Sequence, residues 1–202
     1  MSEHPLLAPI ERSRLSKQIT VQLCRMIGQG QLQPGDRLPP ERELAELVEH
    51  LRSVTSLALW VPFNEGWGQF DAARIAGEVA RLDPTRPVDH ASGWHDQGAG
   101  DLRSLHVYFR PFRVPRAVRH RREPRALALT EYGGYALAVP GHTWGERSFG
   151  YRRMRDPSAL AEAFLRLHRR QLAPAVRQGL AATVYTQLSD VEDELNGLLT
   201  YD

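Results

Sequence analysis

The sequence predicts a parallel α/β fold preceded by a short helical segment, and three observations support this prediction. Apolar runs rich in Val, Leu, Ala and aromatic residues recur after about residue 54. Segments with apolar residues at helical spacing lie between several of these runs. Several runs are apolar throughout, as expected for strands that are buried on both faces of a parallel sheet. Alternating strand and helix patterns favour a parallel architecture, but periodicity alone does not separate an open sheet from a barrel.

The amino-terminal part predicts two helices joined by a tight turn. Over residues 15–27 apolar side chains recur at helical spacing, and glycines at 28 and 30 end the pattern. Pro34-Gly35-Asp36 is typical of a turn. A second helix is expected from Pro39, because proline is tolerated in a first helical turn and the following carboxylates favour the positive helix end.

The rest of the chain predicts five strands and two long helices. The expected strands are 56–63, 87–92, 104–109, 126–132 and 181–188. The expected helices are 70–82, between the first two strands, and 157–176, between the last two.

Two glutamates, Glu65 and Glu131, stand at the ends of apolar runs, and each is followed by glycines. The carboxyl ends of parallel strands open on one face, so the two side chains should converge there. A facing pair of carboxyls suits glycoside hydrolysis, in which one group donates a proton and the other, ionised, attacks the sugar. Their mutual repulsion helps to raise the pKa of one of them.

Neighbouring residues add groups that suit a sugar ligand. Asn64 is placed to hydrogen-bond a hydroxyl, and Trp67, Trp94 and Trp144 offer flat apolar faces to sugar rings. For any one of these side chains, packing or a solvent contact is an alternative role.

Five segments resemble, in order, the catalytic-domain motifs of glycoside hydrolase family 2: WVPFNEGWGQFD, LDPTRPVDHASGW, GDLRSLHVYF, TEYGGY and VYTQLSDVEDELNGLLTYD. The resemblance covers residues 47–202. It implies part of a (β/α)8 TIM barrel, from about strand four to strand eight, and a retaining mechanism. By the matching motifs Glu65 would be the acid/base and Glu131 the nucleophile. Asn64 would contact the sugar 2-hydroxyl, and His106 and Trp94 would line the same pocket.

A whole barrel of this type takes about 250 residues, so the matching segment predicts a truncated one. We therefore expect an incomplete sugar site and an inactive chain, unless another copy completes the barrel through its open edges. The sequence does not choose among galactoside, glucuronide and mannoside.

The segment GQLQPGDRLPPERELAEL resembles the start of a GntR-type winged-helix regulator, and the resemblance extends over residues 11–46. It implies a helix-turn-helix and gives the alternative function, a DNA-binding transcription regulator. The sequence departs from the family at Pro40, where a serine is usual, and no recognition helix is visible after residues 45–49. Nucleic acid is therefore not expected as a partner.

Other features restrict the class of protein. Cys24 is the only cysteine, so no internal disulfide forms, and with no signal peptide or apolar run long enough to span a membrane we expect a cytoplasmic protein. His90, His95, His106 and His142 match no compact metal motif, so no metal or other cofactor is expected. The basic run 116–125 is interpreted as a solvated loop, with a nucleic-acid contact as the alternative.

Overall fold

The computed structural model describes residues 39–65 and 68–201. The chain divides between Leu47 and Val48 into two units, which are described separately. The helix predicted over 15–27 and the predicted sugar-binding residue Trp67 lie outside the described residues.

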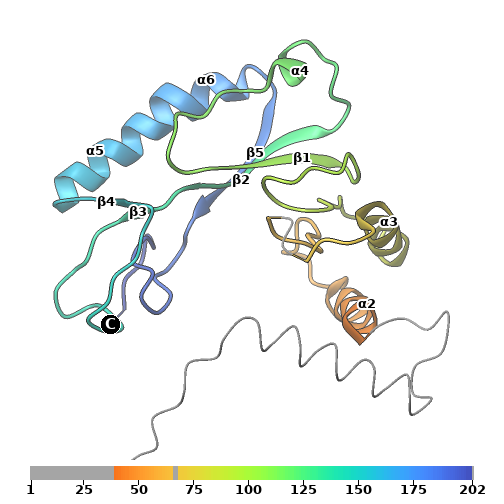
Figure 1. Ribbon diagram of the computed structural model, residues 1–202, viewed down its shortest axis with the longest axis horizontal. Helices are drawn as coiled ribbons and strands as arrows, with labels where there is room; N and C mark the ends of the chain where they lie inside the picture. Colours follow the sequence, from red (N-terminus) through yellow and green to blue (C-terminus); the bar gives the residue numbers. More distant parts are fainter. Residues whose placement is uncertain (1–38, 66–67, 202) are drawn as a thin grey trace, which may run out of the picture. The chain divides into compact units, whose positions relative to one another are not determined.

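The helices follow the predicted apolar periodicity closely (Figure 1). They are α2 (Pro39–Leu51), α3 (Ala72–Leu82), α4 (Arg116–Arg119) and the consecutive turns of α5 (Pro157–Leu167), η1 (His168–Leu172) and α6 (Ala173–Val176). The predictions of helices from Pro39, over 70–82 and over 157–176 are confirmed. Asp156 caps α5, because its Oδ1 accepts a 2.7 Å hydrogen bond from the backbone N–H of Ala159. The short helix α4 lies in the segment that was predicted to be a loop.

The main sheet has three parallel strands in the order β1 (Leu102–Val107), β2 (Ala126–Gly133) and β5 (Leu180–Thr186). A second, two-stranded sheet pairs β3 (Tyr135–Ala136) with β4 (Arg152–Arg153). The strands of the main sheet agree with the last three predicted strands to within a few residues, and each precedes or follows a helical connection (Figure 1).

The predicted strands 56–63 and 87–92 are wrong as regular strands. They meet in two isolated parallel bridges, Trp60 with Val88 and Asn64 with Ser92. Pro62, between the bridges, has no backbone N–H to donate, so the ladder is interrupted there. The apolar pattern predicted two regular strands, whereas the structure has two isolated bridges between these segments.

The bridged segments extend the sheet beyond β1. The backbone N–H of Asp101 donates to the carbonyl of Val88 at 2.8 Å, and the Ser104 hydroxyl donates to the carbonyl of Ala91 at 3.1 Å. The spatial order is therefore the chain order, from residues 60–64 through 88–92 to β1, β2 and β5. Within the described residues this series does not close into a barrel, and the carboxyl-terminal strand β5 forms its last edge.

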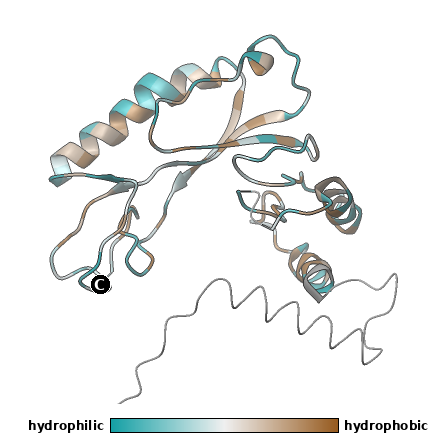
Figure 2. Cartoon of the chain, viewed as in Figure 1, coloured by the Kyte–Doolittle hydropathy of each residue, from teal (hydrophilic) through white to brown (hydrophobic). Residues whose placement is uncertain are grey.

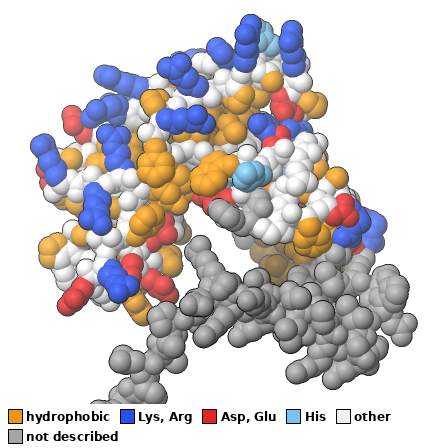
Figure 3. All heavy atoms as spheres, viewed as in Figure 1, with side chains coloured by type: hydrophobic (Ala, Val, Ile, Leu, Met, Phe, Trp, Pro, Cys, Tyr) orange, Lys and Arg blue, Asp and Glu red, His pale blue; other side chains and the backbone are white. Residues whose placement is uncertain are grey.

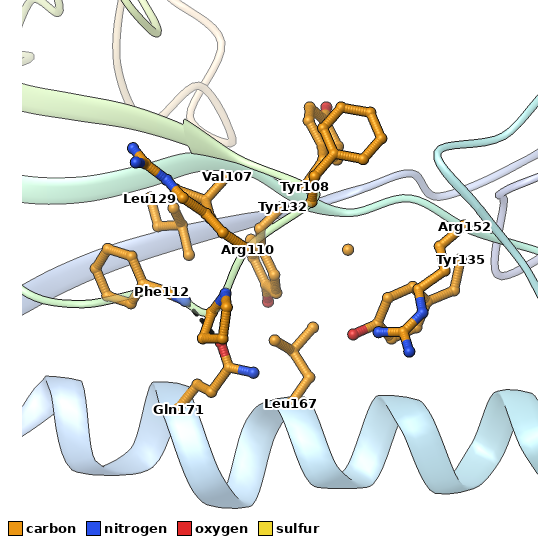
Figure 4. A pocket seen from close by; sticks show the side chains of 13 residues that line it. Val107, Tyr108, Arg110, Phe112, Leu129, Tyr132, Tyr135, Arg152, Leu167 and Gln171 are labelled. Atoms are coloured by element: carbon orange, nitrogen blue, oxygen red, sulfur yellow. Dashed lines mark hydrogen bonds between the residues drawn. The ribbon is translucent and has the colours of Figure 1, made fainter.

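The core fills the space between the sheet and the helix α5–η1–α6. β2 is buried along most of its length, and its Leu127 and Leu129 pack with Leu167 and Leu172 of the helix. In Figure 2 β2 is mostly hydrophobic or neutral, whereas α5 also carries hydrophilic residues. A small cavity of about 90 Å³ lies between the helix and the strand ends, and Leu167 and Tyr132 point into it (Figure 4).

Within the described residues, no helix combines the length and the apolar character that a membrane crossing requires.

Candidate active site at the strand ends

Glu65 and Glu131, sixty-six positions apart in the sequence, meet at one histidine. The Nδ1 atom of His106 lies 3.0 Å from Oε1 of Glu65 and 3.2 Å from Oε2 of Glu131. One carboxylate oxygen of each glutamate lies within 4.8 Å of the other. The sequence prediction that the two side chains converge at the carboxyl ends of parallel segments therefore agrees with this geometry.

Glu65 occupies an uncommon backbone conformation. It follows the bridge between Asn64 and Ser92, and its φ is +54°, in the left-handed region that residues with a β-carbon rarely adopt. Such a conformation costs on the order of 1–3 kcal/mol and persists where surrounding contacts hold it. The hydrogen bond from the Glu65 N–H to the carbonyl of Ser92 is one such contact.

A bulge in β2 turns Glu131 toward Glu65. Leu105 of β1 pairs with Leu129, but the next residue, His106, pairs with Glu131, so Thr130 is the extra residue. In a regular strand Thr130 and Glu131 would point to opposite faces. Because of the bulge both side chains contact the His106 network, as β-bulges near active sites often allow.

The two glycines after Glu131 are needed for close approach of aromatic rings. Gly133 and Gly134 have φ of +89° and +59°, and a β-carbon on them would lie 2.2 Å from the Tyr185 ring and 2.5 Å from the Tyr151 ring. Glycine therefore allows the positive φ at both positions, and the space that a side chain would take is occupied by tyrosine rings rather than left open.

His106 is held from behind by two hydroxyl groups. Its Nε2 lies 2.7 Å from the hydroxyl oxygen of Ser92, which in turn donates to Thr130 Oγ1 at 2.7 Å. The His106 side chain is fully buried, its polar partners are the two carboxylates and the Ser92 hydroxyl, and the Trp94 ring meets its ring edge-to-face. These bonds fix the plane of the imidazole ring between Glu65 and Glu131.

Tyr108 is a site residue that the sequence reasoning missed. Its hydroxyl donates a 2.6 Å hydrogen bond to Oε2 of Glu131 and lies 2.9 Å from Thr186 Oγ1. The Tyr151 ring stacks on the Tyr108 ring with centroids 3.6 Å apart. Burial raises the pKa of the Tyr108 hydroxyl far above its usual range, so this group stays a hydrogen-bond donor. Its position two residues after His106, on the same side of the chain, was the available signal.

The pKa of Glu131 is raised above its ordinary value, first because burial disfavours the charged carboxylate. The hydrogen bond from Tyr108 and the charge of His106 lower it, while the charge of Glu65 raises it again. The two glutamates therefore differ in their hydrogen bonds, because Glu131 accepts a short hydrogen bond from the Tyr108 hydroxyl.

The remaining predicted sugar-binding residues lie at different distances from the two glutamates. Asn64 is exposed directly before Glu65. Trp94 is 56% exposed, and its indole N–H donates to the His106 carbonyl at 3.3 Å. Trp144 is exposed and packs on Tyr201, and the structure gives it no contact with either glutamate.

Of the four histidines weighed as metal ligands in the sequence, His90 and His106 are buried. The Glu65–His106–Glu131 group also has the donors and the spacing to hold a metal ion, since three ligand atoms lie within 4.8 Å of one another. The spacing of histidines in the sequence did not indicate this group.

Comparison with known families concerns the amino-terminal part. A model described as bacterial regulatory proteins of the gntR family matches residues 15–59. The match supports the DNA-binding alternative for this segment and extends past the predicted boundary at residue 46. No curated protein matches the chain. Neither comparison supports the resemblance to glycoside hydrolase family 2.

Proposed function

We propose that residues 48–202 carry the catalytic site of a retaining β-glycosidase, with Glu131 as nucleophile and Glu65 as acid/base. The observation that carries the proposal is the approach of two carboxylates to within 4.8 Å at the ends of parallel segments. Retaining enzymes hold their carboxyl groups about 5–5.5 Å apart, whereas inverting enzymes need a wider gap for water.

The environment of each glutamate suits a different role. Glu131 receives the short Tyr108 hydrogen bond at the oxygen that also faces His106, so one carboxylate oxygen is held and the other is available for attack. Glu65 contacts the same Nδ1 atom of His106 through its Oε1 at 3.0 Å, whereas the Tyr108 hydroxyl donates to Glu131.

The chemistry would proceed in two displacements. Glu131 attacks the anomeric carbon while the Glu65 carboxyl donates its proton to the leaving oxygen, giving a covalent glycosyl-enzyme. Glu65, now ionised, then takes a proton from the water that releases the sugar. Asn64 beside Glu65 and Trp94 beside His106 would contact the sugar during both steps.

The partial barrel belongs to the same proposal. The five parallel segments in chain order correspond to strands four to eight of a (β/α)8 barrel, and their open edges would allow self-association.

The direct test is hydrolysis of a panel of aryl β-glycosides by the whole chain and by Glu131→Gln and Glu65→Ala. Loss of Glu131 should lower turnover by about 10³-fold or more. Azide should restore turnover in Glu65→Ala, because a small anion can replace the water that needs general-base help. Unchanged turnover in Glu131→Gln would refute the assigned nucleophile.

A second candidate function is DNA binding by a GntR-type segment, and the family match over residues 15–59 favours it. Helix α2 lies in this segment, as a helix-turn-helix requires. Residues 52–59, which follow α2, contain no helix, so the recognition helix is not found there. A cytoplasmic location would accompany this function.

The DNA-binding candidate is tested by selecting bound sequences from a random duplex library with the whole chain. Enrichment of a palindromic or half-site motif that Arg42→Gln weakens would support it. Recovery of unenriched sequences would remove sequence-specific regulation as a function of this segment.

A further inference from the structure

Two segments of the carboxyl-terminal unit carry exposed arginines, and neither segment contains an acidic residue. No Asp or Glu occurs from residue 110 to 122 or from 163 to 188. We call the exposed arginines of these segments the arginine face: Arg110, Arg113, Arg116, Arg119, Arg121, Arg122, Arg166, Arg169, Arg170 and Arg177. Since the whole chain has a formal charge of only +2, the rest of the sequence is net acidic and the positive charge is concentrated here.

The two segments are neighbours in space. Phe112 and Val114 of the first segment share one buried cluster with Leu167 and Leu172 of the second. The backbone N–H of Phe112 also donates to Oε1 of Gln171 at 2.7 Å, drawn as a dashed line in Figure 4. Their apolar side chains thus point inward together, which leaves the arginines on a common outer surface.

The two arginine-bearing segments also lie close together at the carboxyl end of α6. A β-carbon on Gly179, just after α6, would lie 3.2 Å from Val118 of the α4 segment. Figure 3 shows basic side chains spread over the part of the surface where Figure 1 draws α4, α5 and α6.

The arginines of this face are largely free of acidic partners. Among the described residues, Arg166 pairs with Glu162 at 3.5 Å, and the structure records no other ion pair for the ten arginines. Unpaired exposed guanidinium groups retain their charge and donors for a ligand, and their fork of N–H groups matches phosphate oxygens.

The helical arginines form a row. Arg166 lies in the last turn of α5, Arg169 and Arg170 follow three and four residues later in η1, and Arg177 directly follows α6. At 1.5 Å per residue the row is about 16 Å long. Duplex DNA carries one phosphate per 3.4 Å of each strand, so the row spans several phosphates of a linear polyanion.

We propose that the arginine face binds the phosphate backbone of duplex DNA without sequence preference. Because arginine replaces lysine almost everywhere in this chain, the use of arginine in the face does not by itself favour DNA binding. DNA binding is favoured by the separation of these arginines from acidic residues. The face lies outside the segment that matches the gntR family. Its Arg110 and Arg113 line a pocket together with His106 and Trp94, so the variant that tests the proposal changes only arginines outside that pocket.

The proposal is tested by fluorescence anisotropy of a labelled 24-base-pair duplex of random sequence, titrated with the whole chain at 50–200 mM KCl. The test variant combines Arg116→Gln, Arg119→Gln, Arg169→Gln and Arg170→Gln. The matched control removes the same charge from exposed arginines elsewhere, with Arg81→Gln, Arg147→Gln, Arg153→Gln and Arg155→Gln. Circular dichroism melts establish that both variants fold.

The wild-type chain should bind with a steep salt dependence, and the test variant should lose about three to four from the slope of log K against log salt concentration. Its affinity at 100 mM KCl should fall at least about tenfold, while the control stays within about twofold of wild type. Loss from Arg42→Gln alone would assign the binding to the gntR-like segment instead.

Three further results would overturn the proposal. They are equal losses in the test and control variants, no duplex binding by the wild-type chain at 50 mM KCl, and binding only to phosphatidylserine vesicles offered in a parallel sedimentation assay.

Discussion

The two glutamates of the candidate site stand on backbones of different kinds. Glu131 lies inside β2, which pairs with β1 on one side and β5 on the other. Glu65 follows an isolated bridge, after an interruption at Pro62, and adopts a left-handed φ. The comparison indicates that the nucleophile candidate is positioned by regular pairing and a bulge, whereas the acid/base candidate is positioned by a few specific contacts.

The largest expected difference concerns stability. Leu129→Ala removes a fully buried side chain from β2 and should lower the free energy of unfolding by about 2–5 kcal/mol. The same change at Leu59, which is partly exposed directly before the bridge at Trp60, should cost about 1 kcal/mol. Urea unfolding of both variants measures the difference, and equal losses would show that the bridged segment is as well packed as β2.

A smaller effect is expected at Tyr108. Tyr108→Phe keeps the ring that stacks on Tyr151 but removes the donor to Glu131, so the pKa of Glu131 should rise further. The free energy of unfolding at neutral pH should fall by about 1–2 kcal/mol, because the buried carboxylate loses a charge-assisted hydrogen bond. Carbon NMR titration of the glutamate carboxyls follows the pKa, and an unmoved Glu131 resonance would contradict the assigned contact.

Backbone strain at Glu65 gives the next test. Both Glu65→Ala and Glu65→Gly remove the carboxylate, but only glycine adopts the left-handed φ without a steric penalty. Glu65→Gly should therefore be more stable than Glu65→Ala by about 1 kcal/mol. If thermal melts place the two variants at the same stability, the conformation at Glu65 is not strained.

The smallest effect is a pH dependence of stability from Glu131. Because burial raises its pKa in the folded state, the folded protein binds this proton more tightly than the unfolded chain. The group is neutral in both states at low pH, and its ionisation costs stability as pH rises from the unfolded value through the folded one. Glu131→Gln should thus match wild type near pH 4 and exceed it by up to about 1 kcal/mol near pH 8. Melts across this range that show a constant difference would argue against a raised pKa.

Much of the architecture could be predicted from the sequence. The helical periodicity of residues 70–82 and 157–176 and the apolar runs of β1 and β2 each predicted the correct element, because burial of one face or of both leaves a clear pattern. The apolar run of β5 also predicted a strand, although its residues 181–184 are exposed. The same patterns predicted full strands at 56–63 and 87–92, where Pro62 and the local turns allow only bridges. Apolar content reports burial, but it does not report whether each backbone N–H finds a partner.

The site was predictable in outline only. Strand-end placement brought Glu65 and Glu131 together, because parallel segments share an edge. The bulge at Thr130 and the hydroxyl pair behind His106 depend on register, which no local pattern of residues specifies. Tyr108 was missed for the same reason, since a tyrosine at a strand end is compatible with many contacts.

The exposed edge of β5 has a consequence for handling the protein. Residues 181–184 are exposed, and β5 pairs on one side only within the described residues, so its outer backbone groups exchange hydrogen bonds with water. A strand from another molecule can replace that water, as at any uncapped sheet edge. Association therefore depends on protein concentration. Dilution favours the monomer with a hydrated β5 edge, and high concentration favours edge-to-edge pairing of β5 with a strand of another molecule.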